Sequence, residues 1–142
     1  MIMPSRAYTA DTDLKLAVVT DTDIVTTRQE GRRFASALSF SSSDLTVIAA
    51  AISEIARNLV SYAARGEVWI RQAERDGRRG IEIEARDHGP GIRDVNLALQ
   101  DGYSTSGSLG LGLPGARRLM DEFEIQSEVG KGTVVVMRMW TR

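Results

Sequence analysis

The longest regular pattern of apolar residues along the chain spans residues 45–63. Apolar side chains recur there at spacings of three and four: Leu45, Ile48, Ala49, Ile52, Ile55, Ala56, Leu59, Val60 and Ala63. This spacing is typical of one face of an amphipathic helix, so we expect a helix over this segment. The serines at 41–43 offer an N-cap for it, and Gly66 is predicted to cap its C-terminal end.

The other predicted elements surround this helix. A β-prone run over residues 14–20 precedes a helix over 21–38, for which Asp21 and Asp23 are the expected caps. Helices are also predicted at 95–99 and 113–123. Four more strands are predicted, two of which alternate apolar and polar residues and are joined by a turn at 76–79: 67–74, 80–87, 124–129 and 133–140.

This order of elements predicts one α/β domain, a two-layer α+β sandwich. Its sheet should be mixed but mainly antiparallel, with helices covering one face. Residues 1–13 show no periodicity and are predicted to be a loose lead-in, so the domain should span residues 14–142.

Composition removes several classes of site. The chain of 142 residues has no cysteine and a single histidine, His88, which excludes disulfides, thiolate metal sites and sites with several histidines. A formal net charge of −1 gives no general attraction to nucleic acid or to acidic membranes. No apolar run approaches the roughly 18–20 residues of a membrane span. We therefore expect a cytoplasmic protein that has neither nucleic acid nor a membrane as partner.

Glu54 and Asn58 are the first candidates for chemistry. They are four residues apart on the predicted helix, so their side chains share one face. A carboxylate beside a carboxamide oxygen suits Mg²⁺, and the carboxylate could instead accept a proton from an attacking hydroxyl. A solvated helix face with an incidental hydrogen bond is the alternative.

A second candidate, the stretch 87–91, reads Asp-His-Gly-Pro-Gly and follows a predicted strand. Asp87 could accept a hydrogen bond from an exocyclic amine such as that of adenine. Gly89 and Gly91 would let the backbone turn tightly and approach a ligand closely. A simple turn made of turn residues is the alternative.

The third candidate is the Gly-rich stretch before the predicted helix at 113–123. Its backbone N–H groups, its hydroxyls and the helix N-terminus together suit the binding of phosphates, and a flexible surface loop is the alternative. The residues concerned are Ser104, Thr105, Ser106, Gly107, Gly110, Leu111, Gly112 and Leu113. A dinucleotide fingerprint would need a strand directly before its glycines, and the P-loop signature is absent. The fourth candidate is Thr133, which contributes only if its hydroxyl points toward Asp87.

Each of these elements is weak alone, but their order resembles that of the GHKL (Bergerat-fold) ATPases. The likeness is greatest to the anti-sigma regulatory serine/threonine-protein kinases, and among them to the stressosome switch kinases. It covers about residues 14–140 and rests on four stretches: DIVTTRQEGRRFASALSF, AISEIARNLVSYAARGEV, DHGPGI and DGYSTSGSLGLGLPGARRLMDEF.

The resemblance implies a role for each candidate residue. Glu54 would be the general base, Asn58 would hold Mg²⁺ between the phosphates of ATP, and Asp87 would bind the adenine amino group with support from Thr133. Gly89 and Gly91 would pass beneath the base, and the stretch 104–113 would form a lid over the phosphates. No lysine or arginine lies between Arg93 and Arg117, which leaves four alternatives as the cation for the γ-phosphate: Arg57, Arg117, Arg118 and Lys131.

The resemblance also implies partners. The protein would phosphorylate STAS-domain proteins on serine or threonine and, once released, activate a PP2C-type phosphatase. Two alternatives stay open: an anti-sigma factor that mainly sequesters an RNA-polymerase sigma subunit, and a nucleotide-gated adaptor without transfer activity. The pairing of Glu54 with Asn58 argues against the adaptor, because an adaptor needs no general base.

Overall fold

A computed structural model describes residues 13–63, 66–91 and 112–142 of the chain. Five strands form one sheet: β1 (Leu14–Val18), β2 (Gly66–Arg75), β3 (Arg78–Asp87), β4 (Glu122–Glu128) and β5 (Gly132–Trp140). The helices are α1 (Asp21–Ser36), α2 (Ser42–Asn58), a π-helical turn η2 (Leu59–Ala63) that continues α2, and α4 (Gly112–Leu119).

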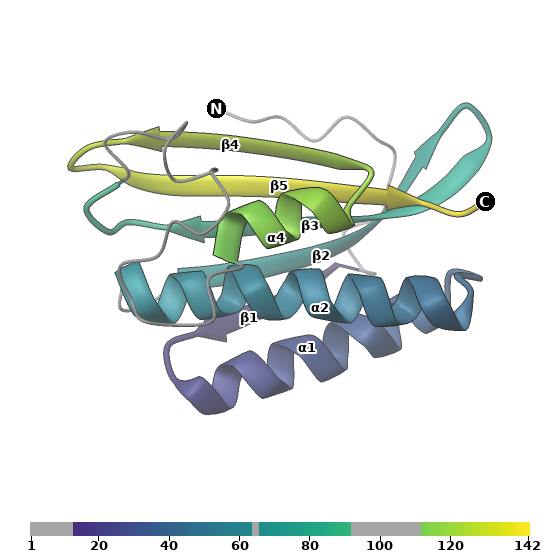
Figure 1. The fold of residues 1–142 in the computed structure, drawn as a ribbon, viewed down its shortest axis with the longest axis horizontal. Coiled ribbons are helices and arrows are strands. Elements are labelled where there is room, and N and C mark those ends of the chain that lie inside the picture. Colours follow the sequence, from purple (N-terminus) through teal and green to yellow (C-terminus); the bar gives the residue numbers. More distant parts are fainter. Residues whose placement is uncertain (1–12, 64–65, 92–111) are drawn as a thin grey trace.

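The strands are ordered β1-β2-β3-β5-β4, and all four neighbouring pairs are antiparallel. The three α-helices lie together on one side of this sheet (Figure 1). This arrangement confirms the predicted two-layer α/β fold, with the refinement that the described strands include no parallel pair.

The core lies between the sheet and the helices. The largest fully buried side chains there include Ile48, Ile52 and Ile55 from α2, which meet Ile70 and Ile83 from the sheet. Because α2 and η2 contribute most of this apolar stripe to the core, the spacing of residues 45–63 identified the central helix of the helical layer.

The N-cap of helix α1 lies one residue before the first of its two predicted caps, Asp21. Thr20 is the N-cap, and its side chain accepts a hydrogen bond from the Asp23 backbone N–H. Asp23 is the third residue of the helix, and its Oδ2 accepts hydrogen bonds from the backbone N–H groups of Val19 and Thr20 at 2.9 and 3.0 Å. Asp23 therefore completes a capping box instead of being the cap itself. At α2 the predicted serine cap is confirmed as Ser41.

Two predicted boundaries are wrong. Gly66 does not cap the central helix but opens β2, where it pairs with both Val18 and Asp87. The last helix ends at Leu119 instead of 123, because Glu122 and Phe123 already pair with β5 as the start of β4. In both places a ladder of backbone hydrogen bonds outweighs the local helical preference.

The hairpin between β2 and β3 turns through two residues, Asp76 and Gly77. Their φ angles are 54° and 76°, both in the left-handed region that a two-residue type I′ turn requires. The predicted hairpin is confirmed, with a shorter loop than the four residues expected, because Arg78 and Arg79 already belong to β3.

Candidate nucleotide-binding site

Asp87 occupies the last position of β3 and is only 7% exposed. One of its carboxylate oxygens, Oδ1, accepts a hydrogen bond from the Gly89 backbone N–H at 2.8 Å. Within the described residues no hydrogen bond reaches its second oxygen. The side chain is therefore held by its own turn, while half of its accepting capacity is left over for another group.

The turn after Asp87 packs against the hairpin between β4 and β5. The Gly130 backbone N–H donates to the Pro90 carbonyl oxygen at 2.8 Å. Gly91 and Gly132 have φ angles of 79° and 113°, and a Cβ atom on either one would collide with backbone, of Glu128 for Gly91 and of Asp87 for Gly132. Glycine is required at both positions, because only glycine combines this φ with so close a backbone approach.

Thr133 follows this contact and is buried. The pairing of Arg86 with Val134, continued by one residue, places Thr133 opposite Asp87 on the face of the sheet that meets the helices. The Thr133 hydroxyl lies 2.8 Å from the Ser127 hydroxyl of β4. Ser127 was not predicted as a site residue, although its place opposite Thr133 follows once the β4–β5 register is known.

Glu54 and Asn58 lie in the last turns of α2, and both are partly buried. Glu54 Oε1 accepts from Arg57 Nη1 at 3.0 Å, so the carboxylate is already paired with a cation of its own helix. Leu59, the residue after Asn58, lies against Gly66, which pairs with Asp87. The end of α2 and the end of β3 are thus neighbours.

Helix α4 begins at the same end of the molecule and lies against α2 (Figure 1). Gly112 opens the helix, and Leu113 is 4% exposed within the core, so its side chain serves packing. The predicted helix at 95–99 lies outside the described residues. So do the other predicted lid residues: Ser104, Thr105, Ser106, Gly107, Gly110 and Leu111.

The four candidate cations differ in their surroundings. Arg57 is bound to Glu54, and Lys131 pairs with Glu128 on an exposed turn. Arg117 and Arg118 are exposed in the last turn of α4, away from the helix N-terminus. Of the four, Arg57 is the candidate that lies beside the predicted site residues Glu54 and Asn58.

Two negative findings concern the described parts of the chain. No group of three or more histidine, cysteine, aspartate or glutamate side chains is placed there to hold a metal ion. None of the described helices is long and apolar enough to cross a membrane.

Comparison with known proteins agrees with this fold. Residues 18–139 match the family model of the histidine kinase-like ATPase domain. The chain is 47% identical to the serine/threonine-protein kinase RsbT of Bacillus subtilis, over 88% of this chain and 94% of that protein. It is 34% identical to the anti-sigma F factor of Caldanaerobacter subterraneus, over 73% of this chain and 76% of that protein.

Among solved structures, a Mycobacterium tuberculosis protein with RsbU and RsbW domains shares the fold. The superposition has a TM-score of 0.65 at 22% identity and covers 92% of this chain. It covers 33% of the other chain, so the present protein corresponds to about a third of that molecule. The family match over residues 18–139 and the 47% identity over most of its length show that the chain belongs to the histidine kinase-like ATPase domain family, the GHKL fold.

Proposed function

We propose that this protein is a serine/threonine protein kinase that transfers the γ-phosphoryl group of ATP to STAS-domain partner proteins. The observation that carries the proposal is the meeting of Asp87, the Gly91 turn and Thr133 at one end of the sheet, beside the end of α2 that bears Glu54 and Asn58. The 47% identity to RsbT, which is named a serine/threonine-protein kinase, supports the reaction type.

Asp87 fits the adenine end of ATP. Its carboxylate is buried, oriented by the Gly89 N–H and able to accept one more hydrogen bond. An exocyclic amine is the donor that such an acceptor selects, and a buried charge-assisted bond of this kind is worth about 1.5–3 kcal/mol. Thr133 would add a second polar group beside Asp87 through its hydroxyl, which Ser127 orients.

Magnesium fits the donor set at the α2 end of the proposed site. The described residues offer no metal cage of their own, whereas Mg²⁺ in phosphoryl-transfer sites usually takes one or two protein oxygens together with the substrate phosphates. The carboxamide oxygen of Asn58 would be that protein ligand. The bound ion would neutralise the charge that develops on the phosphates during transfer.

Glu54 would accept the proton of the attacking serine or threonine hydroxyl. Its carboxylate pairs with Arg57 at 3.0 Å, and Asn58 follows it by four residues on the same helix. Backbone N–H groups at the start of α4 would add positive potential for the phosphates, as helix N-termini do. Most of the catalysis would then come from positioning and charge, with one base for the proton.

We further propose that the released kinase activates a PP2C-type phosphatase. Substrate binding and this second interaction would compete for the surface around the lid, so the nucleotide state would choose the partner. The 34% identity to an anti-sigma F factor supports one alternative, in which the protein sequesters a sigma subunit of RNA polymerase.

The test of the proposal is transfer of labelled phosphate from ATP·Mg²⁺ to STAS-domain proteins of the source organism. Glu54→Ala should abolish transfer and leave ATP affinity within about tenfold, since the base acts only in the chemical step. Glu30→Ala is the matched control, because Glu30 forms the same ion pair with Arg33 on α1, outside the site. Transfer at full rate by Glu54→Ala would remove Glu54 as the base.

The adenine contact has its own test. Asp87→Asn should weaken ATP binding by about 1–3 kcal/mol, because the buried acceptor loses its charge. Asp44→Asn, in the first turn of α2 and so at the helix end opposite Asn58, is the control and should bind ATP as the unmodified protein does. Unchanged ATP affinity in Asp87→Asn would overturn the assignment of Asp87 to adenine binding. ATP binding without any transfer, together with capture of a sigma subunit, would favour the anti-sigma alternative.

A further inference from the structure

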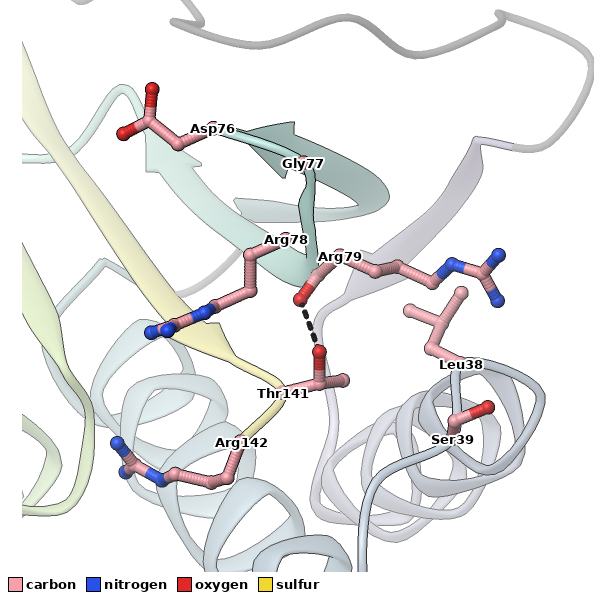
Figure 2. A pocket seen from close by; sticks show the side chains of 8 residues that line it. All are labelled: Leu38, Ser39, Asp76, Gly77, Arg78, Arg79, Thr141 and Arg142. Atoms are coloured by element: carbon pink, nitrogen blue, oxygen red, sulfur yellow. Dashed lines mark hydrogen bonds between the residues drawn. The ribbon is translucent and has the colours of Figure 1, made fainter.

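A basic groove lies at the end of the molecule opposite the nucleotide site. It is an open groove of about 490 Å³ between the β2–β3 hairpin, the residues that follow α1 and the C-terminal residues, and its lining includes Arg78, Arg79 and Arg142 (Figure 2). Strand β3 runs from Arg78 at the groove to Asp87 at the nucleotide site. Nine steps of a strand correspond to about 30 Å, so the two sites are well separated.

The charge of this groove is strongly one-sided. Three arginines line it against a single acidic side chain, Asp76, at the tip of the turn. Arg78 and Arg79 are exposed, and within the described part of the chain neither has an ion-pair partner. Arg142 pairs with Asp121 at 3.0 Å but keeps 64% of its side chain exposed. The groove therefore offers guanidinium groups whose donors are largely directed to solvent.

The frame beneath these arginines is ordered by hydrogen bonds. The Arg79 carbonyl oxygen accepts from the backbone N–H of Thr141 at 2.9 Å. It also accepts from the Thr141 hydroxyl at 2.9 Å, the bond drawn in Figure 2. These two hydrogen bonds attach Thr141 to the second residue of strand β3. Leu38, buried at 5% exposure after the end of α1, gives the groove an apolar side.

The directions of the side chains decide what kind of anion fits. Arg78 and Arg142 extend to one side of the groove, whereas Arg79 extends to the other, the side of Leu38 and Ser39 (Figure 2). A single small anion cannot meet both sets of donors. A polypeptide that presents carboxylates at separate points could meet both, and guanidinium groups pair with carboxylates through two parallel hydrogen bonds.

We infer that this groove binds an acidic segment of a partner protein, and that it does so while the nucleotide site remains open. Nucleic acid fits less well, because its binding usually draws on many phosphate contacts and the chain carries a net charge of −1. The groove thus gives the protein a second attachment point, independent of the surface used for phosphoryl transfer.

The test uses a fluorescein-labelled oligoglutamate peptide and the full chain, with binding followed by anisotropy at low and high salt. The unmodified protein should bind the peptide, more weakly as salt rises. The double variant Arg78→Glu, Arg79→Glu should lose at least about tenfold in affinity, since attraction becomes repulsion. The matched control is Arg28→Glu, Arg32→Glu on the exposed face of α1, which carries the same change of charge and should stay within about twofold.

Several results would overturn the inference. They are an absence of peptide binding, an equal loss in both double variants, displacement of the peptide by millimolar inorganic phosphate, and tighter binding of single-stranded DNA than of the peptide. Affinity for a fluorescent ATP analogue, measured on the same samples, should be unchanged in Arg78→Glu, Arg79→Glu. That readout shows that the variant is folded and keeps this test separate from the proposed kinase activity.

Discussion

On the side of the sheet that meets the helices, Ile70 and Ile83 are buried among other apolar side chains. On the opposite side Arg71, Glu82 and Arg138 are just as buried, at 7%, 1% and 4% exposure, and they are ion-paired with one another. The two sides of one strand, β3, therefore face an apolar and an ionic environment. A charged side chain introduced on the apolar side would be buried without a partner. On the ionic side, removing one charge would leave its buried partner unpaired.

The ionic side extends well beyond one pair. Glu82 accepts from Arg71 at 3.4 Å and from Arg138 at 2.8 Å, and Arg138 continues to Glu122 and Glu124 on β4. The indole N–H of Trp140 donates to Glu122 at 2.8 Å. Four strands are thus linked by side chains across this side in addition to their backbone ladders.

The largest expected effect comes from a cavity on the apolar side. Ile52→Ala should lower the free energy of unfolding by about 2–5 kcal/mol, because Ile52 is fully buried and Gly31 of α1 packs directly against it. Urea unfolding followed by circular dichroism measures this loss. Val25→Ala, on the exposed face of α1, is the control and should change stability by less than about 0.5 kcal/mol. A loss below that level in Ile52→Ala would contradict the assigned core.

On the ionic side, Glu82→Gln should lower the free energy of unfolding by about 3 kcal/mol, although it removes no volume. The loss arises because Arg71 and Arg138 stay buried with less negative charge beside them. Glu67→Gln breaks an exposed pair with Lys15 and should change stability by less than about 0.5 kcal/mol. In a double-mutant cycle, Glu82→Gln with Arg138→Gln should lose less than the sum of the two single variants. Simple additivity would show that the two charges do not stabilise each other.

The smallest effect is a dependence of stability on pH that comes from Glu122 on the ionic side. Burial would by itself raise the pKa of Glu122, but hydrogen bonds from Trp140, Arg75 and Arg138 outweigh it and hold the pKa below its ordinary value. A carboxyl group with a lowered folded-state pKa stabilises the fold above its unfolded pKa, and this contribution is lost as pH falls through the folded pKa. Thermal unfolding between neutral and acidic pH should therefore show a smaller decline for Glu122→Gln than for the unmodified protein. Equal declines would contradict this assignment.

Much of the fold could be predicted from local patterns. The three-and-four spacing of residues 45–63 located α2, and the alternation around Ile81 and Ile83 located β3. Alternation predicted one buried side of the sheet, but it did not predict that Glu82 and Glu84 would be buried on the other. A charged residue in a strand reads as solvent-facing unless its cross-strand partners are known, and those depend on the register of β2, β3 and β5.

For the candidate site, the sequence by itself determined which residue types follow one another: a carboxylate and a carboxamide on a helix, an aspartate after a strand, and a Gly-x-Gly-Thr hairpin. Only the tertiary structure decided that Gly132 presses against the backbone of Asp87 and that Ser127 orients Thr133. The physical reason is that β3 and β5 are neighbours although more than forty residues separate them along the chain. Contacts of this kind follow from strand pairing, which no local pattern of side chains encodes.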